Sequence, residues 1–174
     1  MSFLGLAVPH EISRLLASVD VPGETKPASS YHVTLFYLGD NVPVERLSDV
    51  LAPVYEVTSR TPPFTVETSE ITSFPPKPDG TVPIVARIVS NDLVRLRAEL
   101  KAAFDAAGIE YSKTFPDYRP HVSLAMLEGG ERLADIPIRK VEWGVGEIVL
   151  WGGDYEDDKL IVTFPLVLTP EPTT

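Results

Sequence analysis

The sequence contains no cysteine among its 174 residues. Disulfide bonds, thiolate nucleophiles and cysteine-ligated metal or iron–sulfur sites are therefore excluded, and no feature of the chain requires an oxidising compartment. Hydrophobic residues make up 44% of the chain, as in a globular protein. At this length we expect one domain spanning residues 1–174, which can bury roughly 70% of its unfolded surface.

The sequence is also poor in basic residues and in long apolar runs. Lys and Arg number 15 against 25 Asp and Glu, which gives a net charge of −10. Such a surface repels long RNA, although a locally positive cleft can still hold a small nucleotide. No apolar run approaches the roughly 20 residues of a membrane span, and the apolar N-terminus lacks the basic region of a signal peptide. We expect a cytoplasmic monomer that binds neither membranes nor long RNA.

Two matching tripeptides, His32-Val33-Thr34 and His121-Val122-Ser123, are the most informative feature present. Each one opens an apolar run that alternates as a half-buried strand does, HVTLFYLG and HVSLAML. Residues i and i+2 of a strand point to the same face of the sheet. Each motif therefore offers one imidazole and one hydroxyl side by side, and two such pairs facing one cleft would surround a phosphate.

These groups suit the cleavage of a phosphodiester. The reaction needs a base, an acid and hydrogen-bond donors for the phosphoryl oxygens, and a histidine with a pKa near roughly 6.5 can fill either proton role. No metal and no cofactor are required. The acidic composition and a nearby phosphate favour the imidazolium form, so we expect the basic limb of the pH profile above that value. A strand histidine can also be purely structural, and a histidine pair can bind zinc; the hydroxyl beside each ring favours the acid–base interpretation.

The order of elements suggests two related α+β halves, at about residues 1–80 and 81–168, with a tail at 169–174. Apolar periodicity predicts each element. Strands are expected at residues 3–8, 31–38, 64–73, 82–89, 109–112 and 121–127, and a closing hairpin between 143–151 and 159–168. Helices are expected over 12–19 and 47–54, and a third helix should begin at a cap on Ser90 or Asn91 and stop at Gly108.

Other side chains are candidates for substrate binding. Phe36 would share the cleft face with His32 and Thr34, where it could stack on a base, although a role in the core is equally compatible with its position. Further candidates are Tyr118 and Arg119 before the second motif, Lys113 and Lys26 in the loops that precede each motif, and Tyr155 near the acidic turn, whereas His10, Trp143 and Trp151 are expected to be structural.

In these motifs the chain resembles the two-histidine (2H) phosphoesterase superfamily, the LigT-like group of RNA cyclic phosphodiesterases and 2'-5' RNA ligases. The resemblance includes HVTLFYLG at residues 32–39, RPHVSL at 119–124 and the opening FLGLAVP. It implies a bilobal α+β fold, with two antiparallel sheets and flanking helices around a V-shaped cleft. It also implies that His32 and His121 are the catalytic pair and that Thr34 and Ser123 hold the phosphate.

The sequence thus favours a metal-independent phosphodiesterase that acts on a 2',3'-cyclic phosphate or another small cyclic nucleotide. Two alternatives remain: a 2'-5' RNA ligase or RNA-end cyclic phosphodiesterase, and a nucleotide-binding module without catalysis.

Overall fold

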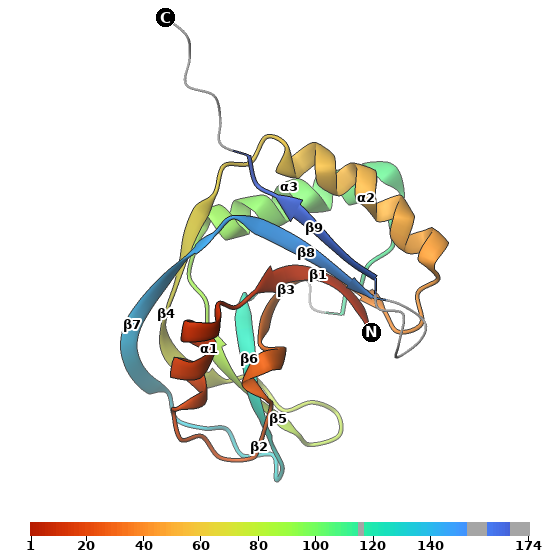
Figure 1. Cartoon of the computed structure of the whole chain (residues 1–174). Coiled ribbons are helices and arrows are strands. Elements are labelled where there is room, and N and C mark those ends of the chain that lie inside the picture. Colours follow the sequence, from red (N-terminus) through yellow and green to blue (C-terminus); the bar gives the residue numbers. More distant parts are fainter. Residues whose placement is uncertain (115–116, 153–159, 168–174) are drawn as a thin grey trace, which may run out of the picture.

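The computed structural model describes residues 1–114, 117–152 and 160–167 (Figure 1). Its helices are α1 (His10–Ala17), α2 (Val44–Thr58) and α3 (Asn91–Ala107), with a short 3-10 turn η1 (Ala28–Ser30). Its strands are β1 (Ser2–Ala7), β2 (Glu24–Thr25), β3 (His32–Gly39), β4 (Phe64–Ser73), β5 (Val82–Arg87), β6 (His121–Leu127), β7 (Ile136–Val145), β8 (Glu147–Gly152) and β9 (Leu160–Pro165). None of the described helices is long and apolar enough to cross a membrane.

The strands form one antiparallel sheet in the order β7-β4-β5-β6-β3-β1-β8-β9, with β2 paired to β6. The expected α+β class is confirmed. The two sheets implied by the resemblance are the two halves of this single sheet, and they meet where β6 pairs with β3 at one position, Val122 with Val33.

The expected division of the chain near residue 80 is wrong. β4 and β5 lie on either side of that point and pair directly, for example Ile71 with Ala86. At the other end of the sheet, β1 pairs with both β3 and β8. One half of the sheet therefore contains residues 64–145, and the other joins the N-terminal strands to the C-terminal ones. The halves of the sheet are set by pairing between strands that are far apart in the sequence, and the order of elements along the chain does not show which strands pair.

Two local expectations also change. Residues 109–112 form no assigned strand, although Ser112 N–H donates to the carbonyl of Tyr37. The expected strand at 143–151 is two strands that separate at Gly146, because β7 pairs with β4 whereas β8 pairs with β1 and β9. The expected closing hairpin is thus formed by β8 and β9, and its acidic turn lies outside the described residues.

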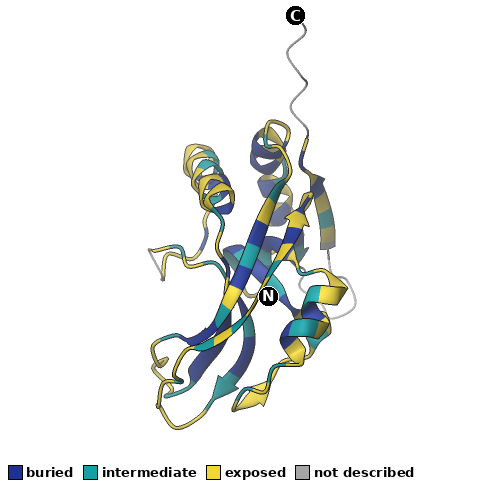
Figure 2. Ribbon diagram, turned by 90° about the vertical axis from the view of Figure 1, so that its left-hand side faces the viewer, coloured by how far each residue is buried: buried dark blue, intermediate teal, exposed yellow. Residues whose placement is uncertain are grey.

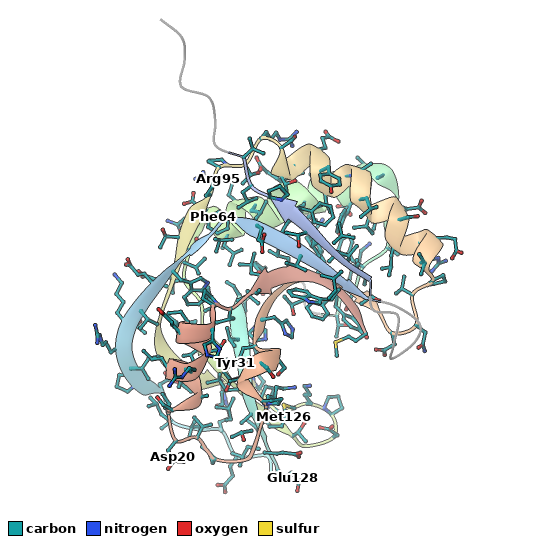
Figure 3. All side chains as sticks on the ribbon, in the orientation of Figure 1. Asp20, Tyr31, Phe64, Arg95, Met126 and Glu128 are labelled. Carbon is teal, nitrogen blue, oxygen red and sulfur yellow. The ribbon has the colours of Figure 1, made fainter. Side chains whose placement is uncertain are left out.

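The helices follow their sequence signals. Ser90 caps α3 by accepting the N–H of Leu93, and Gly108 ends the helix with a φ of 71°. In Figure 1, α2 and α3 lie together on one side of the sheet and α1 lies apart from them. Burial alternates along the strands in Figure 2, and side chains fill the space between sheet and helices in Figure 3. The buried stripe of α3 consists of Leu93, Leu96, Leu100 and Phe104.

Candidate active site

The two motifs begin two neighbouring antiparallel strands, β3 and β6. Because Val33 pairs with Val122, this register places His32 opposite Ser123, and Thr34 opposite His121. Residues directly opposite each other point to the same face. Both valines are fully buried, whereas all four motif side chains are partly exposed. Each imidazole therefore lies beside one hydroxyl along its own strand and beside the other motif's hydroxyl across the sheet.

Both imidazoles are held in the same way. His32 Nδ1 lies 2.9 Å from the carbonyl oxygen of Ser30, and His121 Nδ1 lies 2.7 Å from the carbonyl oxygen of Arg119. A carbonyl can only accept, so each Nδ1 carries the hydrogen. The Nε2 atom of each ring is then left to accept or donate a proton at the substrate.

Burial sets the protonation of the pair. It lowers the pKa of both His32 and His121 below the ordinary 6.5, and the carbonyl hydrogen bonds oppose this effect only in part. The positive charge of Lys26 lowers the pKa of His32 further, and the charge of His32 lowers that of His121. For the free protein, the expected rise in histidine pKa is therefore wrong, because local burial outweighs the acidic net charge.

Aromatic rings line both histidines. The His32 ring stacks on Phe3, with centroids 4.4 Å apart, and Phe3 stacks in turn on Trp151 at 4.8 Å. Phe74 meets His121 edge-on at 4.7 Å and 77°. Packing of this kind restricts ring rotation, so the two Nε2 atoms have defined directions.

A β-bulge interrupts each motif strand at the third residue after its histidine. Two neighbouring residues of β1 pair with the β3 residues on either side of Leu35, so the pairing skips Leu35. Two neighbouring residues of β5 likewise pair with the β6 residues on either side of Leu124, so the pairing skips Leu124. The extra residue reverses the alternation of side chains beyond that point. In β3 the extra residue lies between Thr34, which pairs with Gly5, and Phe36, which pairs with Leu4. In β6 it lies between Ser123, which pairs with Val85, and Ala125, which pairs with Ile84.

The bulge removes Phe36 from the face of the sheet that carries the histidines. Its side chain is only 2% exposed and packs against Phe104 of α3 and against Tyr111. The prediction that Phe36 stacks on a base is therefore wrong, because strict alternation does not hold beyond Leu35. Gly5 permits the close strand approach here, since an added Cβ would clash with the carbonyl oxygen of Val33.

Tyr118 is held within the protein. Its hydroxyl donates to the carbonyl oxygen of Thr34 at 3.0 Å, and burial raises its pKa well above the ordinary value. The prediction of a substrate contact is wrong for this hydroxyl. Tyr118 instead connects the loop before the second motif to the strand of the first.

The remaining predicted contacts have different outcomes. Lys113 lies over the ring of Tyr111 at 5.4 Å, and that tyrosine donates to Asp105 of α3. Lys113 is thus placed on the α3 side of β3 and not beside the histidines. The Arg119 side chain is exposed, so its contact with substrate stays a prediction. Tyr155 lies outside the described residues.

Side chains that the sequence motifs do not identify also reach the site. Arg87 of β5 pairs directly with His121, so it lies on the same face of the sheet as the histidines, where its Nε is 3.8 Å from Oε2 of Glu70. Phe3 and Trp151 lie opposite each other on β1 and β8. Only strand pairing brings these residues to the motifs, so no local pattern could have revealed them, although Lys26 was identifiable from its place before the first motif.

No group of three or more His, Asp or Glu side chains within the described ranges is arranged to hold a metal ion. The polar groups gathered on the histidine face of the sheet are two imidazoles, two hydroxyls and the guanidinium of Arg87, with Glu70 beside that guanidinium. These groups donate to and accept from phosphate oxygens directly.

Comparison with solved structures shows the same fold throughout. The protein TT0787 of Thermus thermophilus superposes with a TM-score of 0.74 at 20% identity, covering 95% of this chain and 97% of that one. A structure titled as a phosphoesterase gives 0.71 at 18% identity, covering 96% and 98%. Escherichia coli LigT, in its complex with NADP+, gives 0.70 at 20% identity, covering 96% and 97%.

The sequence itself carries the family assignment. Comparison with curated proteins gives no match. Residues 23–154, which include both motifs, match the family model of the 2'-5' RNA ligase superfamily. The match covers well over half of the chain, and its boundaries contain the cleft-facing pairs of β3 and β6. The chain therefore belongs to the 2'-5' RNA ligase superfamily, a group of two-histidine phosphoesterases.

Proposed function

We propose that this protein hydrolyses a small cyclic nucleotide phosphodiester, such as a 2',3'-cyclic phosphate, by general acid–base catalysis. The observation that carries the proposal is the arrangement of His32, Thr34, His121 and Ser123. Each imidazole has Nδ1 held by a carbonyl and lies diagonally across from the other, with a hydroxyl at each remaining corner. A phosphate above this square would meet a base, an acid and two hydroxyl donors.

The reaction follows from these groups. Nε2 of one neutral histidine takes a proton from water as the water oxygen bonds to phosphorus. The phosphorus–oxygen bond to one ribose oxygen breaks, and the other, protonated histidine gives its Nε2 proton to that oxygen. Thr34 and Ser123 donate to the non-bridging oxygens, where negative charge gathers in the transition state. The two histidines end with exchanged protonation, which solvent resets.

His121 is the ring that we expect to be neutral in this scheme. A proton on His32 lowers the pKa of His121, so the singly protonated pair keeps His121 neutral. We therefore assign the base to His121 and the acid to His32 for hydrolysis. If a ribose hydroxyl takes the place of water, the same steps open the cyclic phosphate and join that hydroxyl to phosphorus. The reverse reaction, in which the two histidines exchange roles, re-forms the cyclic phosphate and releases the hydroxyl.

The surroundings favour a small substrate. Lys26 places positive charge near His32 in a chain of net charge −10, and Arg87, which is paired with Glu70, lies beside His121. A short nucleotide therefore gains local attraction at the histidines without meeting the acidic surface. Phe3 and Trp151 are only partly buried beside His32, and a base can stack on such rings. Structures of Escherichia coli LigT are titled as complexes with 3'-AMP and with phosphate.

A panel of substrates tests the proposal. The protein is incubated in excess EDTA with 2',3'-cyclic mononucleotides, cyclic dinucleotides, cyclic trinucleotides and a long RNA ending in a cyclic phosphate. We expect turnover of at least one small cyclic substrate and a lower kcat/KM for the long RNA. His32→Ala and His121→Ala serve as matched inactive controls.

Other outcomes point elsewhere. Turnover that requires added zinc or manganese contradicts the metal-independent mechanism. Joining of RNA ends without hydrolysis supports the ligase, and tight binding without turnover supports a binding module.

A further inference from the structure

Arg97 is the one arginine of α3 that reaches a motif strand in the described structure. Its Nε donates to the carbonyl oxygen of Leu35 at 3.3 Å, and the side chain is partly buried. Leu35 is the extra residue of the β3 bulge. The contact therefore falls on the residue of β3 beyond which the side chains that share the histidine face change.

The guanidinium of Arg97 lies among aromatic rings. Its Cζ is 4.1 Å from the centroid of Phe36, 5.3 Å from that of Tyr118 and 6.0 Å from that of Tyr111. Within the described residues it forms no ion pair with a carboxylate. Cation–π attraction offsets part of the cost of burying this charge, and the hydrogen bond to Leu35 fixes its direction.

Arg95 shows how different this is from an ordinary helix arginine. It lies two residues earlier on α3, its side chain is 70% exposed, and its one ion pair within the described residues is with Asp92, at 3.4 Å. Figure 3 shows it at the outer edge of the molecule. Arg95 is therefore a matched control for any change made at Arg97.

Tyr118 completes the hold on the bulge. Its hydroxyl donates to the carbonyl of Thr34, and Arg97 donates to the next carbonyl along the chain, that of Leu35. Two consecutive carbonyls of β3 are thus fixed by side chains from α3 and from the loop before β6. Both donors also pack together, with the guanidinium of Arg97 over the Tyr118 ring.

The bulge determines which side chains of β3 face the substrate. In a regular strand, Phe36 would share the face of Thr34 and would crowd the two histidines. In the bulged strand, Phe36 is buried beneath Arg97 and the hydroxyl of Thr34 stays beside His121. We propose that Arg97 is a positioning residue, which locks the β3 bulge so that Thr34 points at the phosphate of the substrate. This inference rests on the proposed function.

The second motif needs no such side chain. The equivalent carbonyl, that of Leu124 in the β6 bulge, accepts the backbone N–H of Lys26 at 2.9 Å. The backbone N–H of Lys26, the residue after β2, therefore holds the β6 bulge in the way that the side chain of Arg97 holds the β3 bulge. A side-chain substitution can release the first bulge but not the second.

The test compares Arg97→Ala with Arg95→Ala in a steady-state assay on the cyclic nucleotide that the panel identifies. We expect Arg97→Ala to lower kcat by about 10- to 100-fold, the scale of a misplaced reacting group, with KM changed less than about threefold. Added guanidinium ion at millimolar concentration should restore part of kcat, because it can occupy the vacated site. Arg95→Ala should match the wild type, with or without guanidinium.

Three results would overturn the inference. Arg97→Ala could keep its kcat, it could lose activity only in proportion to the unfolded fraction seen by circular dichroism, or guanidinium could fail to restore it. If the wild type turns over no substrate, the proposed function fails by itself. Titration of inorganic phosphate into wild type, Arg97→Ala and Arg95→Ala then tests the positioning role, which predicts weaker binding only in Arg97→Ala.

Discussion

His32 on β3 and His121 on β6 share a backbone arrangement but differ in their surroundings. Both donate Nδ1–H to the carbonyl two residues earlier, and both are followed by a bulge at the third residue. His32 lies flat on Phe3 within reach of Trp151, whereas His121 meets Phe74 edge-on and has Arg87 as its strand neighbour.

The features that the two histidines share are those that proton transfer needs, and the features that differ are those that contact different parts of the substrate. The shared features set the direction of Nε2 and of the hydroxyls, so they belong to the proton transfers. The unshared features are the stacked rings of Phe3 and Trp151 on the His32 side and Arg87, with its ion-pair partner Glu70, on the His121 side. We infer that the base of the nucleotide lies on the His32 side and that Arg87 serves phosphate on the His121 side.

Removing either histidine should have the largest effect. His32→Ala and His121→Ala should each lower kcat by roughly 10²–10⁴-fold, the usual range for a general acid or base. The double variant should be little worse than either single one, because the two groups act together. Single-turnover assays on the identified substrate measure this, and a single variant with near wild-type activity would refute the pairing.

A substrate with a good leaving group sharpens this comparison. A nucleoside 3'-(4-nitrophenyl) phosphate releases an anion that needs no proton, so loss of the acid should matter less. We expect His32→Ala to recover most of its activity on this ester and His121→Ala to recover little. Equal recovery in both variants would contradict the assignment of His32 as acid.

The two hydroxyls should rank next. Thr34→Val and Ser123→Ala each remove a donor to the phosphoryl oxygens, and each should lower kcat by roughly 10²-fold. Thr34→Ser keeps the hydroxyl and should stay close to the wild type. Ser112→Ala, at an exposed hydroxyl that contacts Thr114, is the control. A rise in KM with kcat unchanged would show that the hydroxyls bind the substrate and the transition state equally.

The aromatic side chains should separate binding from chemistry. Trp151→Ala removes stacking area and should raise KM about tenfold, with kcat nearly unchanged. Phe74→Ala loosens the ring of His121 and should lower kcat more than it raises KM. Purine and pyrimidine substrates measured side by side provide the readout, and equal behaviour of both variants would remove the distinction between the two sides.

The pH dependence should give the smallest effect. Burial lowers both histidine pKa values below 6.5, and activity needs one ring neutral and the other protonated. As pH rises above both values, the second proton is lost, so kcat/KM should already decline above about pH 6.5. Lys26→Gln removes a charge that lowers the pKa of His32, so the alkaline limb should move to higher pH. A plateau extending to pH 8 in the wild type would contradict this prediction.

Local sequence signals predicted much of the fold. The alternation at residues 32–38 and 121–127 identified both motif strands, and Ser90 and Gly108 marked the ends of α3. The division into halves failed, because β1 pairs with β8 from the far end of the chain. Register between distant strands is set by the whole sheet, and periodicity within one segment contains no information about it.

The candidate site was predicted only as far as alternation holds. His32 and Thr34, with His121 and Ser123, lie on one face as the spacing of two residues requires. Phe36 was misplaced because the alternation reverses at Leu35, and the reversal depends on Gly5 of β1 and Arg97 of α3.

The sequence by itself determined the reacting groups and the strands that present them. A histidine and a hydroxyl two residues apart on an extended chain share a face whatever surrounds them. Only the tertiary structure decided that Val33 meets Val122, which turns two separate pairs into one diagonal site. It also decided that Phe3 and Trp151 line His32, that Arg87 neighbours His121 and that Arg97 holds the bulge. These contacts join residues far apart in the chain, and only the packed sheet and its helices bring them together.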